Sequence, residues 1–156
     1  NEVQRATLAP AVHLVNVDRW LTERDAPNVA SKKAILAALY KAGARDDQLI
    51  TLAAITEGES GRKITAVGDV EIQTGDWGPS VSVFQIRTLK SQTGKGTTRD
   101  INRASTLEGG ARSAVELWNQ SVERGKPGWQ PWTAAIKGWH VPHLPTYTAT
   151  AAEMGL

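Results

Sequence analysis

The sequence predicts a mainly helical α+β fold, in which a small β-ribbon or irregular lobe follows the second strongly predicted helix. Residues 31–43 and 46–61 combine helical spacing of apolar residues with residues that begin and end helices. Residues 64–89 differ in texture, because they are rich in Gly, Val and Ile and contain three turn signals. The chain has 156 residues, so one domain with a substantial core is expected.

Composition narrows the class of protein and the kind of site. Apolar residues make up 40% and charged residues 22%, and no run approaches the ~18 apolar residues of a membrane-spanning helix. The 18 Lys and Arg are interspersed with 16 Asp and Glu, so nucleic-acid binding is not indicated. The sequence has no cysteine, which removes disulfides, thiolate metal ligands and cysteine nucleophiles. His13, His140 and His143 form no metal-ligand motif with carboxylates, and no cofactor is expected.

The two strongly predicted helices lie within residues 31–61. We predict residues 1–30 to be an N-terminal helical or linker segment. Ser31 is the expected N-cap of the first strong helix, which should stop at Gly43. Asp46 is expected to cap the second helix, and Gly61 is expected to end it.

Residues 64–89, after the second helix, are predicted to form a small β-ribbon or an irregular lobe. The segment should return to helix near Phe84, and a polar loop should follow. Its turns are expected at Gly68-Asp69, Gly75-Asp76 and Gly78-Pro79.

The C-terminal third predicts further helices. Ser105 and Glu108 have the spacing of a capping box, and Gly125 marks the end of the helix that they begin. Pro131 is expected to open a short helix, and residues 145–156 are a candidate for a last one.

Two glutamates at the end of the second helix point in different directions if the helix is regular. An α-helix turns ~100° per residue, so Glu59 falls about 20° from Leu52 on the apolar face. Glu57 falls about 140° from Leu52, and we expect it to face water. A carboxyl group on the core side has a raised pKa, as a general acid requires. The alternative is that the helix frays at Gly58 and that Glu59 is solvated.

Tryptophan is unusually frequent, with six residues against one phenylalanine. These side chains either fill the core or line a groove with flat amphipathic rings. The residues concerned include Trp77, in a predicted loop, and Trp118, Trp129, Trp132 and Trp139 in the last quarter.

The stretches "AAITEGESGR", "AVGD", "GDWGPSVSVFQIR" and "WQPW" together resemble the lysozyme-like muramidases, in particular the soluble lytic transglycosylase and goose-type lysozyme group. The resemblance runs from about Leu49 to Trp132 and is nearest to domains of phage endolysins and tail proteins. It implies that residues 31–156 form a lysozyme-like catalytic domain. The motif with a tyrosine that the family has near the end of the domain is missing, since "AAIKGW" stands there.

The resemblance also implies roles for individual residues. It makes Glu59 the catalytic acid, and it makes Gln85 the side chain that the segment from Ser82 places against the substrate. The family usually has Gly where Ser82 stands. Further substrate-binding candidates in the matching motifs are Trp77, Ser80, Ser82 and Trp132.

A second carboxylate would decide between two reactions on the same bond. Asp69 and Asp76 are the candidates, and Asp69 is favoured because the resembled family also has an Asp there. In such loops Asp most often bonds its own backbone instead. A lysozyme uses a second carboxylate, whereas a lytic transglycosylase uses one glutamate twice.

The resemblance therefore implies a peptidoglycan-cleaving glycosidase, most readily a lytic transglycosylase that forms 1,6-anhydromuramyl ends. The alternatives are a hydrolytic lysozyme, a glycan-binding module without catalysis, and a structural phage domain. The expected partners are peptidoglycan strands, with no nucleic acid and no membrane insertion, for a monomer or a domain of a larger phage protein. The chain begins Asn-Glu-Val and shows no secretory signal, so we expect a processed chain or a piece of a longer one that acts in the bacterial cell wall.

Overall fold

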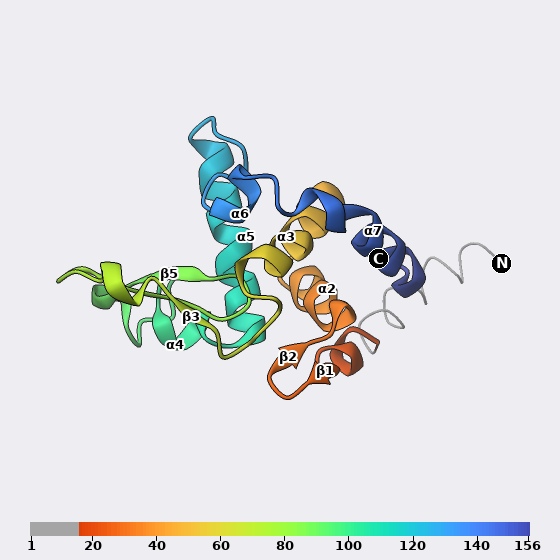
Figure 1. Ribbon diagram of the computed structural model, residues 1–156, viewed down its shortest axis with the longest axis horizontal. Helices are drawn as coiled ribbons and strands as arrows, with labels where there is room; N and C mark the ends of the chain where they lie inside the picture. The colour runs from red at the N-terminus through yellow and green to blue at the C-terminus, as the bar shows by residue number, and fades with distance from the viewer. Residues whose placement is uncertain (1–15) are drawn as a thin grey trace.

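The computed structural model describes residues 16–156 and confirms the mainly helical α+β fold. Helix α3 (Asp46–Glu59) is its central element. It packs against α2 (Lys32–Lys41), α5 (Leu107–Glu123) and α7 (Leu144–Met154). Figure 1 shows α2 and α7 on one side of α3, and α5 and the small sheet on the other.

The N-terminal hairpin leads into the helical core. Strands β1 (Arg24–Ala26) and β2 (Val29–Ala30) pair antiparallel directly before α2. Residues 16–20 are helical, and His13 lies outside the described residues. Val17, Trp20 and Leu21 belong to the same buried cluster as α2 and α3. The division of the chain at residue 30 stays a prediction.

The helix caps agree with the sequence in some places and differ in others. Ser31 caps α2 as predicted, because its Oγ accepts a 3.0 Å hydrogen bond from the backbone N–H of Ala34. Asp46 was wrongly expected to cap α3: it is the first helical residue, the N-cap is Arg45, and no side chain caps this end. Arg45 has the extended backbone of an N-cap, so the helix begins at Asp46, one residue earlier than the capping pattern indicated.

The predicted capping box of α5 is also shifted by one residue. Thr106 is the N-cap, and its Oγ1 accepts from the backbone N–H of Gly109 at 3.0 Å. Ser105 instead ends the short helix α4 (Ile101–Ala104), where its hydroxyl donates to the carbonyl of Ile101. Only Ser105 and Thr106 separate the two helices, so Ser105 is the C-cap of α4 and Thr106 is the N-cap of α5.

A three-stranded antiparallel sheet forms the predicted β-lobe. Its order is β3 (Val67–Gly68), β4 (Trp77–Val81), β5 (Ile86–Leu89), and the 3₁₀ turn η1 (Val70–Ile72) lies between β3 and β4. Residues 82–85 connect β4 to β5 as a tight turn, so the predicted return to helix near Phe84 is wrong. The turn needs positive φ at Ser82 (66°) and Gln85 (48°), which a helix does not tolerate.

After β5 the chain leaves the sheet and returns to helical structure. It passes through η2 (Lys90–Gln92), α4 and α5. Helix α6 (Thr133–Ile136) begins after the N-cap Trp132, so Pro131 precedes it and does not open it. The 3₁₀ turn η3 (Val141–His143) leads into α7, which confirms the predicted last helix.

Helix α3 is buried on more than one face, which the sequence reading did not anticipate. Leu49, Leu52 and Ile55 are buried as expected. Thr56 and the two alanines at 53 and 54 are also fully buried, since α2, α5, α6 and α7 surround the helix. No side of this helix can therefore be assigned to water from periodicity alone. None of the helices within residues 16–156 combines the length and hydrophobicity of a membrane span.

Candidate active site

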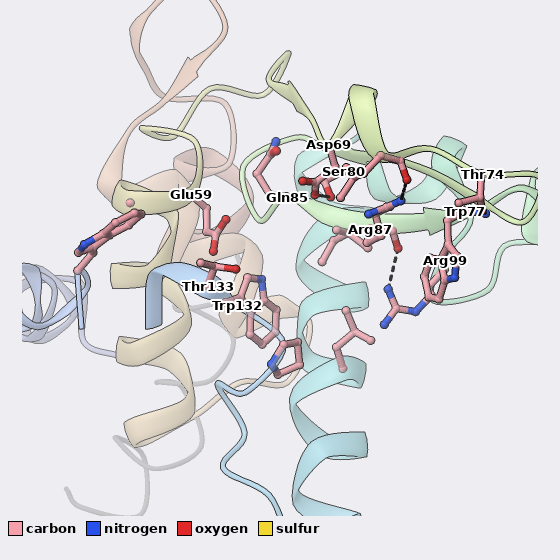
Figure 2. A pocket seen from close by; sticks show the side chains of 16 residues that line it. Glu59, Asp69, Thr74, Trp77, Ser80, Gln85, Arg87, Arg99, Trp132 and Thr133 are labelled. Atoms are coloured by element: carbon pink, nitrogen blue, oxygen red, sulfur yellow. Dashed lines mark hydrogen bonds between the residues drawn. The ribbon is translucent and has the colours of Figure 1, made fainter. Parts of the chain in front are cut away.

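A cleft of about 790 Å³ separates the end of α3 from the small sheet (Figure 2). One wall is formed by the C-terminal turn of α3 and residues 131–139, and the other by the sheet and the loop that contains η1. The cleft brings together six of the site residues that the sequence singled out: Glu59, Asp69, Trp77, Ser80, Gln85 and Trp132.

Glu59 reaches this cleft from the last residue of α3 and is half-buried. Its Oε1 accepts a 3.0 Å hydrogen bond from the backbone N–H of Ala134. Burial raises the pKa of the Glu59 carboxyl above its ordinary value of 4.5, and the charge of Asp69 raises it further. The Ala134 N–H acts in the opposite direction, because it stabilises the ionised form. Glu59 thus holds its proton to a higher pH than a solvated glutamate.

The residues next to Glu59 explain why the helix end is held so close to the second wall. Gly58 is needed because a Cβ there would lie 3.0 Å from the Cβ of Ala134 and 3.3 Å from that of Trp139. Ser60 ends the helix, and its Oγ donates a 2.7 Å hydrogen bond to the carbonyl of Val83 in the β4–β5 turn. The "GES" stretch therefore fixes Glu59 between the two walls.

Glu57 does not face water, and that prediction is wrong. Only 13% of its side chain is exposed. Its Oε1 accepts a 2.7 Å hydrogen bond from the Tyr147 hydroxyl on α7 and lies 3.0 Å from the Arg62 Nε. Lys32 at the start of α2 lies 3.9 Å away. Glu57 is outside the residues that line the cleft, so the structure places it in an ion-pair network behind the helix end.

Asp69 lines the cleft, and Asp76 does not. Asp69 has φ 56° and its side chain makes no hydrogen bond that caps η1. Instead Ser80 donates its hydroxyl to Oδ2 of Asp69. The carboxylate is thus bonded to a side chain of β4 at the cleft and does not cap its own turn. The role of Asp69 in a reaction stays a prediction.

Gln85 lines the cleft but uses its amide hydrogens within the protein. Its Nε2 donates to the carbonyls of Ser82 (2.8 Å) and Ala66 (3.2 Å). Its Oε1 occupies the space where any side chain at position 68 would stand, which accounts for Gly68. Only the amide oxygen is left to meet a ligand, so Gln85 first of all holds the turn that closes the cleft.

Ser82, a predicted substrate-binding residue, is not among the residues that line the cleft. It is 1% exposed, its φ is 66°, and its hydroxyl has no hydrogen-bond partner within residues 16–156. A glycine tolerates this backbone conformation without strain, which gives a physical reason for the family's preference at this position.

Replacing Ser82 by Gly is therefore expected to stabilise the protein by about 1 kcal/mol. The gain comes from relief of the left-handed strain and of the unsatisfied hydroxyl, and the greater flexibility of glycine in the unfolded chain offsets part of it. Denaturant unfolding of the purified variant measures this change. A loss of stability would show that Ser82 makes a favourable interaction that outweighs both costs.

The two predicted tryptophans have different roles in the wall. Trp132 is 3% exposed, and its Nε1 donates to the Phe84 carbonyl at 2.9 Å, which ties the start of α6 to the β4–β5 turn. Trp77 is 37% exposed and presents its ring to the cleft. Trp139, which was not among the site predictions, is 51% exposed beside Gly58. Both predicted readings of the tryptophans, as core and as groove lining, therefore hold for different residues.

Sequence reasoning missed two arginines of the lining, Arg87 and Arg99. Arg87 is the last letter of "FQIR", a stretch that was used only for its glutamine. Within residues 16–156 no group of three or more His, Asp or Glu side chains is placed to hold a metal ion.

The architecture is a helical domain whose central helix delivers a half-buried carboxyl group into an open cleft beside a small sheet. Residues 36–134 match the model of a family described as a lysozyme-like domain, and the chain belongs to this family. Family membership supports an enzyme of the glycosidase class that acts on peptidoglycan in the bacterial cell wall. Neither the curated proteins nor the solved structures gave a match to the chain.

Proposed function

We propose that the chain cleaves the β-1,4 bond between N-acetylmuramic acid and N-acetylglucosamine, as a lytic transglycosylase. The observation that carries the proposal is the position of Glu59, half-buried in the cleft with a raised pKa. Cleavage of a glycosidic bond needs a proton on the leaving oxygen and an open path for the sugar chain. In the proposed reaction the Glu59 side chain supplies the proton, and the space between the two walls of the cleft admits the sugar chain.

In the first step the protonated Glu59 gives its proton to the glycosidic oxygen. The bond to the anomeric carbon of N-acetylmuramic acid breaks, and positive charge develops on that sugar. Glu59 is then ionised, and the backbone N–H of Ala134 stabilises the new charge on Oε1. This one hydrogen bond stabilises the ionised carboxylate, but it lowers the pKa of Glu59 by less than burial raises it.

In the second step the ionised Glu59 takes the proton from the 6-hydroxyl of the same sugar. The hydroxyl oxygen bonds to the anomeric carbon and closes a 1,6-anhydro ring. Glu59 is protonated again, and no water is consumed. This route requires one carboxyl group that acts first as acid and then as base.

A hydrolytic lysozyme is the second candidate, and Asp69 is the observation that favours it. Asp69 lines the cleft, and its charge contributes to the raised pKa of Glu59. In that mechanism Asp69 would activate water or attack the anomeric carbon. Because Ser80 donates to Asp69 Oδ2, one carboxylate oxygen is already engaged. We therefore favour transglycosylation, with Asp69 as an electrostatic neighbour of Glu59.

The products distinguish the two reactions. Purified peptidoglycan digested with the protein is expected to yield muropeptides that are lighter by one water than the hydrolytic products, as mass spectrometry measures. Asp69→Asn is expected to keep cleavage within about tenfold of the unmodified protein, because general base catalysis by a second carboxylate would contribute ~10²–10⁴. Asp76→Asn, at an exposed position outside the cleft, is the matched control. Reducing ends alone, together with a loss of about 10² or more in Asp69→Asn, would establish hydrolysis instead.

The setting of the activity is part of the proposal. The resemblance of "GDWGPS" and "FQIR" to phage endolysins and tail proteins supports a phage-encoded domain that acts on the host cell wall. We propose residues 31–156 as its catalytic domain, with glycan strands as its partner and without a cofactor.

A further inference from the structure

One end of the cleft holds a cluster of two arginines and a tryptophan. The guanidinium carbon of Arg99 lies 5.1 Å from the centre of the Trp77 ring, and that of Arg87 lies 5.7 Å from it. All three residues line the cleft. Figure 2 shows this arginine–tryptophan cluster (Trp77, Arg87 and Arg99) at the opposite end of the cleft from Glu59, with Asp69 and Gln85 between them.

The two guanidinium groups are held in place by neutral acceptors. Arg87 donates through Nε to the carbonyl of Gly78 (2.6 Å) and through Nη2 to that of Ile72 (2.7 Å). Arg99 donates through Nη1 to the carbonyl of Arg87 (2.7 Å). These bonds fix the orientation of both side chains, but they leave both positive charges without compensation.

No carboxylate within residues 16–156 forms an ion pair with either arginine. Each guanidinium has five N–H groups, and the bonds above use two of Arg87 and one of Arg99. No nitrogen of Arg87 or Arg99 is both buried and without a hydrogen-bond partner. The N–H groups that make no bond within the protein are therefore accessible to solvent. Burial lowers the pKa of Arg99, and the charges of Arg124 and Arg87 lower it further. An anion at this place would offset that repulsion.

We propose that the arginine–tryptophan cluster binds a carboxylate carried by an N-acetylmuramic acid residue of the glycan strand. This inference rests on the proposed function, because the strand brings the carboxylate into the same cleft. Guanidinium groups pair with carboxylates through two parallel hydrogen bonds, and the face of Trp77 can pack against the attached sugar or peptide. The carboxylate is either the lactyl group of a sugar without peptide or a carboxylate of the stem peptide.

Binding is measured by calorimetry on the full chain, with Glu59→Gln in every protein so that no ligand is cut. Three oligosaccharides of equal length serve as ligands: one of alternating N-acetylglucosamine and N-acetylmuramic acid with stem peptides, the same without peptides, and neutral chitooligosaccharide. At least one of the two acidic ligands is expected to bind about tenfold more tightly than the neutral one, as charged hydrogen bonds allow. The ligand with that preference identifies which carboxylate is bound.

Adding Arg99→Gln is expected to remove the preference: the ratio of the affinities for the acidic and the neutral oligosaccharide, both measured on the same variant, should fall to about one. Arg112→Gln removes the same charge at an exposed position outside the cleft and is expected to keep the preference. If Arg99→Gln does not fold, Arg99→Lys provides the second test. It keeps the charge but loses the paired donors, so the preference should fall without vanishing.

The salt dependence of binding to the Glu59→Gln protein tests the proposal without an arginine substitution. Raising sodium chloride from ~0.05 M to ~0.5 M should reduce the preference, since screening weakens exposed charge interactions. Equal affinity for acidic and neutral ligands, or a preference that persists in Arg99→Gln, would overturn the proposal. The proposed cleavage can fail without affecting this result, because the assay does not depend on catalysis. Conversely, cleavage by a protein without any preference would overturn only the role of the cluster.

Discussion

Glu59→Gln is expected to lower the rate of peptidoglycan cleavage by about 10³-fold, within the range that general acid catalysis contributes. Glutamine keeps the size of the side chain and can still accept the hydrogen bond from Ala134, but it has no proton to give. Initial rates of dye release from labelled peptidoglycan measure the effect. Glu123→Gln, which removes an exposed carboxylate from the end of α5, is the matched control and is expected to keep full activity.

The pH dependence follows from the same carboxyl group. Burial raises the Glu59 pKa above 4.5, and the reactive form is protonated, so kcat/KM should fall as pH rises through a value above 4.5. Stability changes in the same direction. Because the folded pKa exceeds the unfolded one, the stabilising effect of protonation is complete below the unfolded pKa and is lost through the folded pKa. The unmodified protein should therefore lose free energy of unfolding between pH ~4 and pH ~7 through this group, and Glu59→Gln should not. The difference in stability between the two proteins should shift in favour of Glu59→Gln as the pH rises. A stability difference independent of pH would contradict the raised pKa.

Glu57→Gln is expected to destabilise the protein by about 2 kcal/mol, because it breaks a largely buried ion pair. Arg62 would lose the Glu57 carboxylate at 3.0 Å and keep that of the more exposed Asp25. The Tyr147 hydroxyl would lose a charged acceptor. For a chain of this length the midpoint of thermal unfolding should fall by ~4–8 °C. This effect is the opposite of what the sequence pattern indicated for a residue that faces water.

Tyr147→Phe separates the contributions within this network. It removes only the hydroxyl that donates to Glu57 and should cost about 1 kcal/mol. In the double variant with Glu57→Gln the two losses should not add, because the residues share one interaction. Unchanged stability in Glu57→Gln would mean that the ion pair contributes nothing and that α7 is held by apolar packing alone.

The sequence was sufficient for much of the helical framework and for the position of Glu59, the proposed acid, in the cleft. Regular apolar spacing and glycine positions located α2 and α3, and helical geometry placed Glu59 on the side of Leu52. The same geometry failed for Glu57, because it assumes one buried face. Here α7 covers the other face of α3, and the Tyr147 that binds Glu57 lies 90 residues further along the chain.

Two other features depended on contacts that local patterns do not reveal. The turn at residues 82–85 has strand-like neighbours and a buried Phe84, and its positive φ angles fall on Ser82 and Gln85, not on glycine. The arginine–tryptophan cluster joins β4, β5 and the loop before α4, so its members are separated in sequence by up to 22 positions. Charge at Arg87 and Arg99 was visible, but their common orientation was not.

The most direct test of the proposed acid compares glycan strands after digestion by the unmodified protein and by folded Glu59→Gln at equal amounts of bound protein. We expect new chain ends with the unmodified protein and almost none with the variant, although both bind the strands. An equal number of new ends from both proteins would contradict the assignment of Glu59 as the proton donor.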